Sequence, residues 1–160
     1  MQALTCKAFH RVKTHKTCFF MVLVHRREHF NAAHRLFNPN WTKEKNEEIF
    51  GVCANEYYHG HNFELIVSVA GTPDADTGFV IDMKKLGLLI KEHITSKCDH
   101  RNLNIEVEMF KDKIPSCEVM VMEFWHILAP KIPEIAMAKD ARLHTIRLYE
   151  TNNNFVEYFG

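Results

Sequence analysis

The residues of this 160-residue sequence best suited to metal chemistry are the two histidines of the segment His59-Gly60-His61. On a β-strand, residues i and i+2 point to the same face, so the two imidazoles would lie side by side. Gly60 between them allows another group to approach the backbone closely. Two imidazoles supply two arms of a tetrahedral zinc site. The alternative is a chance spacing in a chain that contains eleven histidines.

A third nitrogen ligand is expected from His34, which lies near the end of the preceding predicted strand. That strand pairs naturally with the strand that begins at His59. Three protein ligands leave one coordination position open, which is typical of a catalytic zinc site rather than a closed structural one. We therefore predict a catalytic zinc ion held by His34, His59 and His61.

Four further residues could take part in chemistry near such a site. Cys53 lies six residues before His59 and could be a fourth ligand, a nucleophile, a base or a small buried hydrophobic residue. The adjacent pair Asp99 and His100 could tune proton transfer, or could be a polar turn that ends a helix. Glu150 could accept two N–H groups of a heterocycle, or could be a solvated strand end.

Composition limits the class of protein. Twenty basic and twenty acidic residues give no net charge, so neither a nucleic-acid nor a membrane partner is expected. Five cysteines without a C-x-x-C pair argue against a disulfide framework and favour the cytoplasm. The longest apolar stretch, residues 18–24, is too short to span a bilayer.

The apolar pattern predicts the element order ββααββ, an α+β fold with a four-stranded antiparallel sheet and two helices on one face. The two expected helices begin at the capping residues Asp82 and Ser116. Residues 41–52 are expected to be irregular apart from one helical turn. The expected ranges are strands over 21–36 with a polar break at 25–28, 59–70, 143–150 and 154–159, helices over 82–96 and 116–128, and a loop over 99–115.

Domain organisation follows from the same pattern. Residues 21–160 are expected to form a single catalytic domain, and the basic residues 1–20 a poorly ordered N-terminal extension. A four-stranded sheet leaves two open edges, which favour pairing with other chains. We therefore expect an oligomer.

Five short segments occur together in an order that is similar to one known family. They are Phe30-Asn31-Ala32-Ala33-His34-Arg35-Leu36, Cys53-x5-His59-Gly60-His61-Asn62, Asp99-His100-x-Asn102-Leu103, Pro115-Ser116-Cys117-Glu118 and Tyr149-Glu150-Thr151. Through these segments, residues 21–160 resemble the family of 6-pyruvoyl-tetrahydropterin and 6-carboxy-tetrahydropterin synthases.

The resemblance implies the tunnelling fold (T-fold), a homohexamer built as a dimer of trimers, and a pterin pocket between subunits. It implies a zinc-dependent lyase that acts on 7,8-dihydroneopterin triphosphate, eliminates triphosphate and completes an internal redox rearrangement. The implied site residues are the zinc ligands His34, His59 and His61, the catalytic residues Cys53, Asp99 and His100, and the substrate-binding residues Ser116, Cys117, Glu118 and Glu150.

Departures and alternatives remain within this resemblance. Cys117 stands where the family more often has Thr or Ser, and Asn31 stands where a small residue is commoner. The spacing C-x5-HGH favours the pyruvoyl product over the 6-carboxy product of the queuosine pathway, for which C-x3-HGH is typical. A non-catalytic pterin- or zinc-binding module would not need Cys53 or the Asp99–His100 pair. Dihydroneopterin aldolase and GTP cyclohydrolase do not explain His34 together with His59 and His61.

Overall fold

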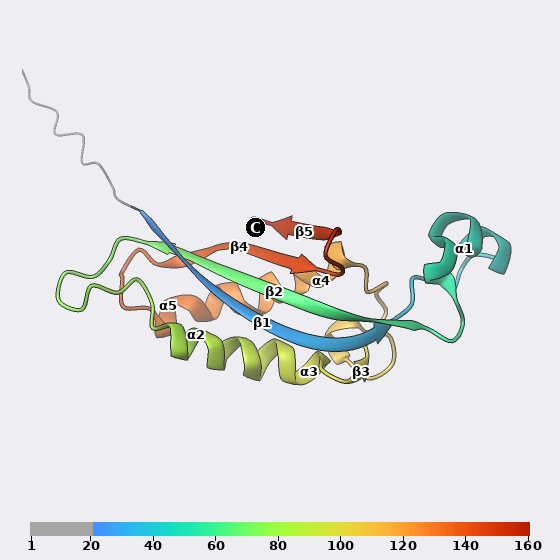
Figure 1. The fold of residues 1–160 in the computed structure, drawn as a ribbon, viewed down its shortest axis with the longest axis horizontal. Coiled ribbons are helices and arrows are strands. Elements are labelled where there is room, and N and C mark those ends of the chain that lie inside the picture. Colours follow the sequence, from blue (N-terminus) through green and yellow to red (C-terminus); the bar gives the residue numbers. More distant parts are fainter. Residues whose placement is uncertain (1–20) are drawn as a thin grey trace, which may run out of the picture.

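A computed structural model describes residues 21–160, so the interpretation of residues 1–20 as an extension lies outside the described part of the chain. The described residues form one sheet covered on one face by helices (Figure 1). The strand order is β3-β1-β2-β4-β5. The elements are β1 Val22–His34, α1 Lys43–Phe50, η1 Gly51–Ala54, β2 His59–Gly71, α2 Met83–Ile90, η2 Lys91–Thr95, α3 Ser96–Cys98, β3 Arg101–Asn102, η3 Glu108–Phe110, α4 Cys117–Leu128, η4 Ala129–Lys131, α5 Ile132–Ile135, β4 Arg142–Tyr149 and β5 Phe155–Tyr158.

The four long strands are antiparallel, as the sequence predicts, and the two-residue strand β3 adds a short parallel pairing beside β1. Strands β1 and β2 pair along their whole length, from Val22 opposite Gly71 to His34 opposite His59. The polar break expected at residues 25–28 is wrong, because these residues pair continuously with residues 65–68. Their polar side chains alternate between the two faces of the sheet, so polarity here does not interrupt the strand.

The core lies between the sheet and helices α2 and α4. Phe30 of β1 stacks on Phe63 of β2 with ring centroids 5.0 Å apart, and Phe124 of α4 meets Phe30 edge-on at 6.2 Å. All three rings are buried. Residues i and i+2 of a strand share a face, so His34 lies on the same face of β1 as Phe30, and His61 on the same face of β2 as Phe63. This is the face that the helices cover.

Capping residues begin both main helices where the sequence predicts them. The Asp82 carboxylate accepts hydrogen bonds from the backbone N–H groups of Lys84 and Lys85, at 2.8 and 3.2 Å. The Ser116 hydroxyl accepts one from Val119 at 3.4 Å. Helix α2 continues through the π-helical turn η2 and the short α3 to Cys98. The predicted Asp99 therefore follows closely after a π-helical turn, a feature common near functional sites.

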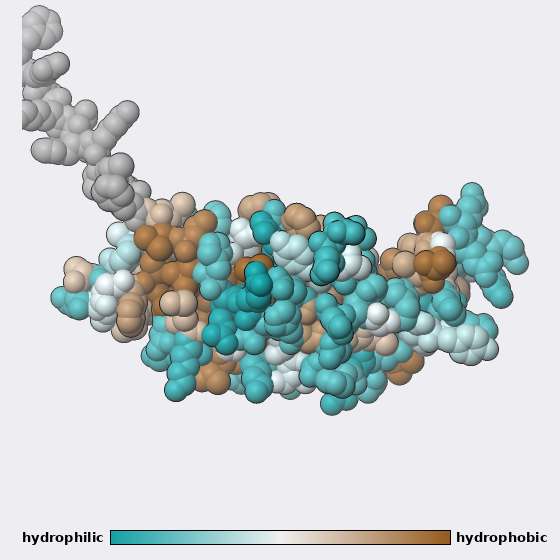
Figure 2. Space-filling model, viewed as in Figure 1, coloured by the Kyte–Doolittle hydropathy of each residue, from teal (hydrophilic) through white to brown (hydrophobic). Residues whose placement is uncertain are grey.

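A helical arm projects from the end of the sheet where β1 ends and β2 begins (Figure 1). It consists of α1 and η1, so residues 41–52 contain more helix than expected. Apolar side chains gather on this arm and where β1 begins (Figure 2). Val52 of η1 is 88% exposed, and Tyr57, between η1 and β2, is 83% exposed. Among the described residues, no helix is long and apolar enough to cross a membrane.

Candidate metal centre and active site

Three histidines converge at the arm end of the sheet. His34 is the last residue of β1 and lies opposite His59, the first residue of β2, while His61 is two residues further along the same face. The candidate ligand atoms of all three lie within 4.8 Å of one another. Gly60 faces the neighbouring strand so closely that an added Cβ would lie 3.3 Å from the Ala32 carbonyl oxygen. The predicted triad therefore arises directly from the register of β1 and β2.

The free nitrogens of this triad have no protein partner that satisfies them. Within residues 21–160, His34 Nε2, both ring nitrogens of His59, and His61 Nε2 are buried and have no hydrogen-bond partner. Leaving buried polar atoms unpaired is costly, so such a cluster needs an explanation. Neutral imidazoles facing one another are the ligand set that zinc prefers, so these residues fit a metal ion.

Electrostatics keeps the triad in the form that binds metal. Burial lowers the pKa of His34, His59 and His61, and the neighbouring imidazoles of the triad contribute in the same direction. The Glu150 carboxylate opposes this effect but does not outweigh it. The imidazoles are therefore neutral near pH 7, with lone pairs available for a metal.

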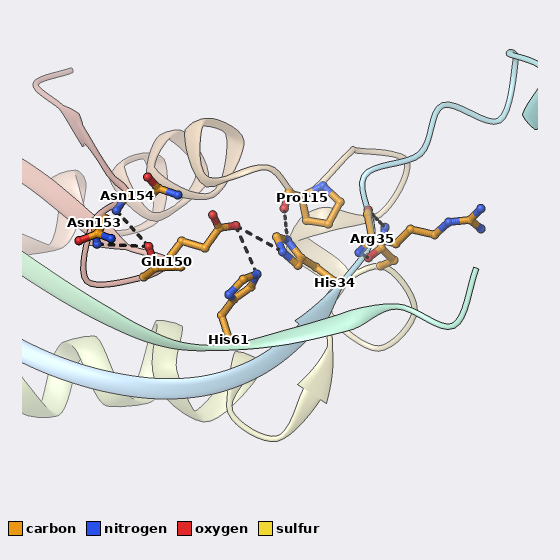
Figure 3. Close-up of polar contacts among 9 residues, drawn as sticks. His34, Arg35, His61, Pro115, Glu150, Asn153 and Asn154 are labelled. Atoms are coloured by element: carbon orange, nitrogen blue, oxygen red, sulfur yellow. Dashed lines mark hydrogen bonds and ion pairs between the residues drawn. The ribbon is translucent and has the colours of Figure 1, made fainter. Parts of the chain in front are cut away.

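His34 is held by a hydrogen bond that sequence inspection does not reveal. Its side chain is fully buried, and Nδ1 donates to the backbone carbonyl of Pro115 at 2.9 Å (Figure 3). A bond of this kind fixes the ring orientation and the tautomer of a ligand histidine. The acceptor is a backbone atom just before the cap of α4, so no side-chain pattern could have identified it.

Glu150 lies immediately after β4, and its carboxylate points toward the triad (Figure 3). Its Oε1 is 3.5 Å from His34 Nε2 and 3.6 Å from His61 Nε2. The turn behind it is closed by hydrogen bonds from the backbone N–H groups of Glu150 and Thr151 to the Asn154 carbonyl, at 3.0 and 3.3 Å. This turn fixes where the glutamate leaves the sheet.

One cavity brings together five of the predicted site residues. Cys53, Ser116, Cys117, Glu118 and Glu150 all line it. The remaining lining residues, which the sequence patterns did not indicate, are Leu36, Asn153, Asn154, Phe155 and Val156. A heterocycle in this cavity would meet two thiols, two carboxylates and a hydroxyl.

Cys53 reaches the cavity from η1 at the base of the arm. Its carbonyl accepts a hydrogen bond from the Leu36 N–H at 2.9 Å, which ties the base of the arm to the end of β1. Burial raises the pKa of the Cys53 thiol, and the nearby Glu150 carboxylate raises it further. Burial and the Glu150 carboxylate likewise raise the pKa of Cys117. In the absence of a cation, both thiols are therefore protonated.

Asp99 and His100 lie apart from that cavity. Asp99 accepts a hydrogen bond from the Asn31 N–H at 2.8 Å and contacts His100 Nδ1 at 3.0 Å. The pKa of Asp99 is lowered, mainly by the hydrogen bond from the Asn31 N–H and next by the hydrogen bond with His100. His100 has a positive φ of 57° and a side chain that is 77% exposed. His100 lines a different depression, together with Asn31 and Asn62, and neither residue of the pair lines the cavity that contains Cys53.

The helix-covered antiparallel sheet, with its inward histidine triad, defines an enzyme of the tunnelling-fold class. The family model described as 6-pyruvoyl tetrahydropterin synthase matches residues 23–160. The chain belongs to this family, and it is therefore a lyase of the 6-pyruvoyl tetrahydropterin synthase type that acts on a pterin substrate.

Individual relatives agree with this assignment. The 6-pyruvoyl tetrahydrobiopterin synthase of Pongo abelii is 36% identical over 86% of this chain and 90% of its own length. The enzyme of the same name from Dictyostelium discoideum is 34% identical over 87% of this chain and 96% of its own. The structure of the Caenorhabditis elegans 6-pyruvoyl tetrahydropterin synthase superposes with a TM-score of 0.77 at 31% identity, covering 88% of this chain and 96% of that chain.

Proposed function

We propose that this protein is a zinc-dependent 6-pyruvoyl-tetrahydropterin synthase that acts on 7,8-dihydroneopterin triphosphate. The single observation that supports this most strongly is the buried triad His34, His59 and His61, whose free nitrogens face one another beside a cavity that holds a thiol and a carboxylate. These three residues would hold a zinc ion, which would supply Lewis-acid chemistry that polarises the side-chain oxygens of the substrate and acidifies the neighbouring C–H bond.

The chain's own residues divide the remaining work. Glu150 accepts N–H groups of the pterin edge, because a carboxylate can receive two parallel hydrogen bonds. Cys53, as a thiolate, removes the acidified proton, since its raised pKa in the free protein falls when a cation lies nearby. Asp99 and His100 relay or return protons. Triphosphate leaves by elimination, and proton shifts along the side chain complete an internal redox change that needs no further cofactor.

The first turn of α4 supplies the rest of the pterin pocket. Ser116, Cys117 and Glu118 line the same cavity as Cys53 and Glu150, from the capped end of that helix. Cys117 offers a weak S–H donor at the position where the family more often has a hydroxyl. We assign these three residues to substrate contacts rather than to proton transfer.

Assembly into a hexamer, a dimer of trimers, is part of this proposal. Among the residues that the structure describes, β3 pairs with β1 only at Ala32 and Ala33, so the remaining length of β1 has an open edge there, and β5 has one on the other side of the sheet. Such edges favour pairing with neighbouring chains. A site between subunits would also bring Asp99 and His100 of one chain to the Cys53 of another, which the single protomer does not do.

The alternative product is 6-carboxy-5,6,7,8-tetrahydropterin from the same substrate. A protein of that name from Rickettsia typhi is 26% identical over 86% of this chain, whereas relatives named as pyruvoyl synthases reach 36%. The C-x5-HGH spacing from Cys53 to His61 also favours the pyruvoyl product.

Product identification tests the proposal. The zinc-loaded protein is incubated with 7,8-dihydroneopterin triphosphate without oxygen, and the products are separated and weighed by mass spectrometry. We expect 6-pyruvoyl-tetrahydropterin and free triphosphate. A 6-carboxy product would assign the alternative, and intact substrate with bound zinc would indicate a non-catalytic binding module.

A further inference from the structure

The Glu150 carboxylate faces the free nitrogens of the triad across a short gap. Oε1 lies 3.5 Å from His34 Nε2 and 3.6 Å from His61 Nε2 (Figure 3). Ligands placed 2.0–2.1 Å from a tetrahedral zinc ion are separated from one another by about 3.3–3.4 Å. Glu150 Oε1 is therefore close to the ligand-to-ligand spacing from two of the three histidines.

The hydrogen bond of His34 shows why this approach needs a cation. The Pro115 carbonyl only accepts, so Nδ1 carries the hydrogen that it donates over 2.9 Å. In the neutral ring, Nε2 is then a lone pair, and it faces a carboxylate oxygen that also only accepts. His61 Nε2 is likewise buried, and no described residue hydrogen-bonds to it. The His34 lone pair and the Glu150 oxygen repel one another at this distance unless a positive charge lies between them.

We propose that Glu150 is a fourth ligand of the metal ion in the substrate-free protein, and that it must leave the metal before it can hold the pterin. The second half rests on the proposed function, in which the same carboxylate anchors the pterin edge. One carboxylate cannot face both partners, so ring binding and metal ligation by Glu150 compete. The position that substrate oxygens will occupy stays closed until a pterin draws Glu150 away.

Metal affinity tests ligation without any measurement of turnover. Metal-free protein is titrated with zinc against a chromophoric chelator for the wild type, Glu150→Gln, Glu150→Asp and Glu118→Gln. Loss of the ligand should weaken zinc binding by roughly 10- to 100-fold in Glu150→Gln. Glu150→Asp keeps the charge but shortens the side chain, so it should weaken binding too. Glu118 lines the same cavity, so Glu118→Gln controls for loss of a nearby charge and should have little effect.

Several results would overturn the ligation. One is an unchanged zinc affinity in Glu150→Gln. Another is a loss of zinc affinity in Glu118→Gln as large as that in Glu150→Gln. The third is wild-type zinc affinity in Glu150→Asp, which would mean that the negative charge alone suffices. Thermal unfolding of each metal-free variant checks that it folds. If Glu150→Gln does not fold, the comparison of Glu150→Asp with Glu118→Gln decides the matter.

Competition tests the second half. Unsubstituted pterin, which has the ring but no side chain to reach the metal, should weaken zinc binding to the wild type and have no such effect on Glu150→Gln, because linkage is reciprocal. Pterin that binds without changing the zinc affinity of the wild type would overturn the competition. Failure of pterin to bind would be seen as unchanged pterin fluorescence, and it would refute the role of Glu150 as the pterin anchor in the proposed function. The chelator titration would still decide whether Glu150 is a metal ligand.

Discussion

Replacing Asn46 with alanine should open the arm that carries Cys53 while the metal triad stays intact. The Asn46 side chain is fully buried in α1, although most residues of the arm are exposed. Its carbonyl accepts from the Asn38 N–H at 2.7 Å, and its amide donates to the carbonyls of Asn38 and Thr42 at 3.0 Å each. These bonds close the loop between β1 and α1, so they determine how firmly the arm is held.

The size of the effect follows from those three bonds. Each contributes about 0.5–1.5 kcal/mol net, and a buried partner left unpaired costs more. The local opening free energy of the arm should therefore fall by about 2–4 kcal/mol, which corresponds to roughly 30- to 1,000-fold faster exchange of its amides. Because Cys53 lies at the base of the arm, turnover should fall as well, while zinc content should not.

Hydrogen exchange followed by mass spectrometry of peptides covering residues 38–54 measures this directly. Asn38→Ala is the matched control, because it removes only the side-chain acceptor of the Asn40 N–H at 3.0 Å and keeps the backbone groups that bind Asn46. Unchanged exchange in Asn46→Ala, or equally fast exchange in Asn38→Ala, would refute the role of Asn46 as the anchor of the arm.

Three further predictions concern the site and the assembly. Cys53→Ala should keep its zinc and its pterin binding but turn over about a hundredfold more slowly. As the control, replacement of the buried Cys98 by alanine should retain turnover. Equal rates in the two variants would contradict the role of Cys53 as the base. Zinc should stay bound below pH 6.5, roughly the pKa of an exposed histidine, because burial lowers the pKa of the triad and protonation of the imidazoles weakens metal binding. Zinc loss that begins near pH 7, roughly half a unit above that value, would contradict this. Sedimentation at micromolar concentration should give a hexamer, and a stable monomer would show that the sheet edges need no partner.

Much of the fold was predictable because strand periodicity leaves a strong signal. The alternation of apolar residues placed β1, β2, β4 and β5 to within a few residues, and the caps Asp82 and Ser116 placed the two main helices. Helix α1 was underestimated, because its charged sequence has little apolar periodicity. What holds it is the amide of Asn46, and the partners of such a residue are not visible in the sequence.

The histidine triad was also predictable from strand periodicity. The position of Asp99 relative to the triad and Cys53 was not. The spacing of His59 and His61 fixes a shared face, and the pairing of β1 with β2 brings in His34. The location of Asp99 beside Asn31, outside the cavity that Cys53 lines, depends on how the chain continues after the π-helical turn η2. Local sequence does not determine that path.

The metal content of the purified protein tests the central claim most directly. Elemental analysis of the wild type should find about one zinc ion per chain, and the double variant His59→Ala, His61→Ala should lose it while the chain remains folded. Because His34 alone supplies a single nitrogen, residual binding in the double variant should not survive a wash with chelator. Full retention of zinc by the double variant, or a wild-type protein that binds no zinc when it is supplied, would contradict the account.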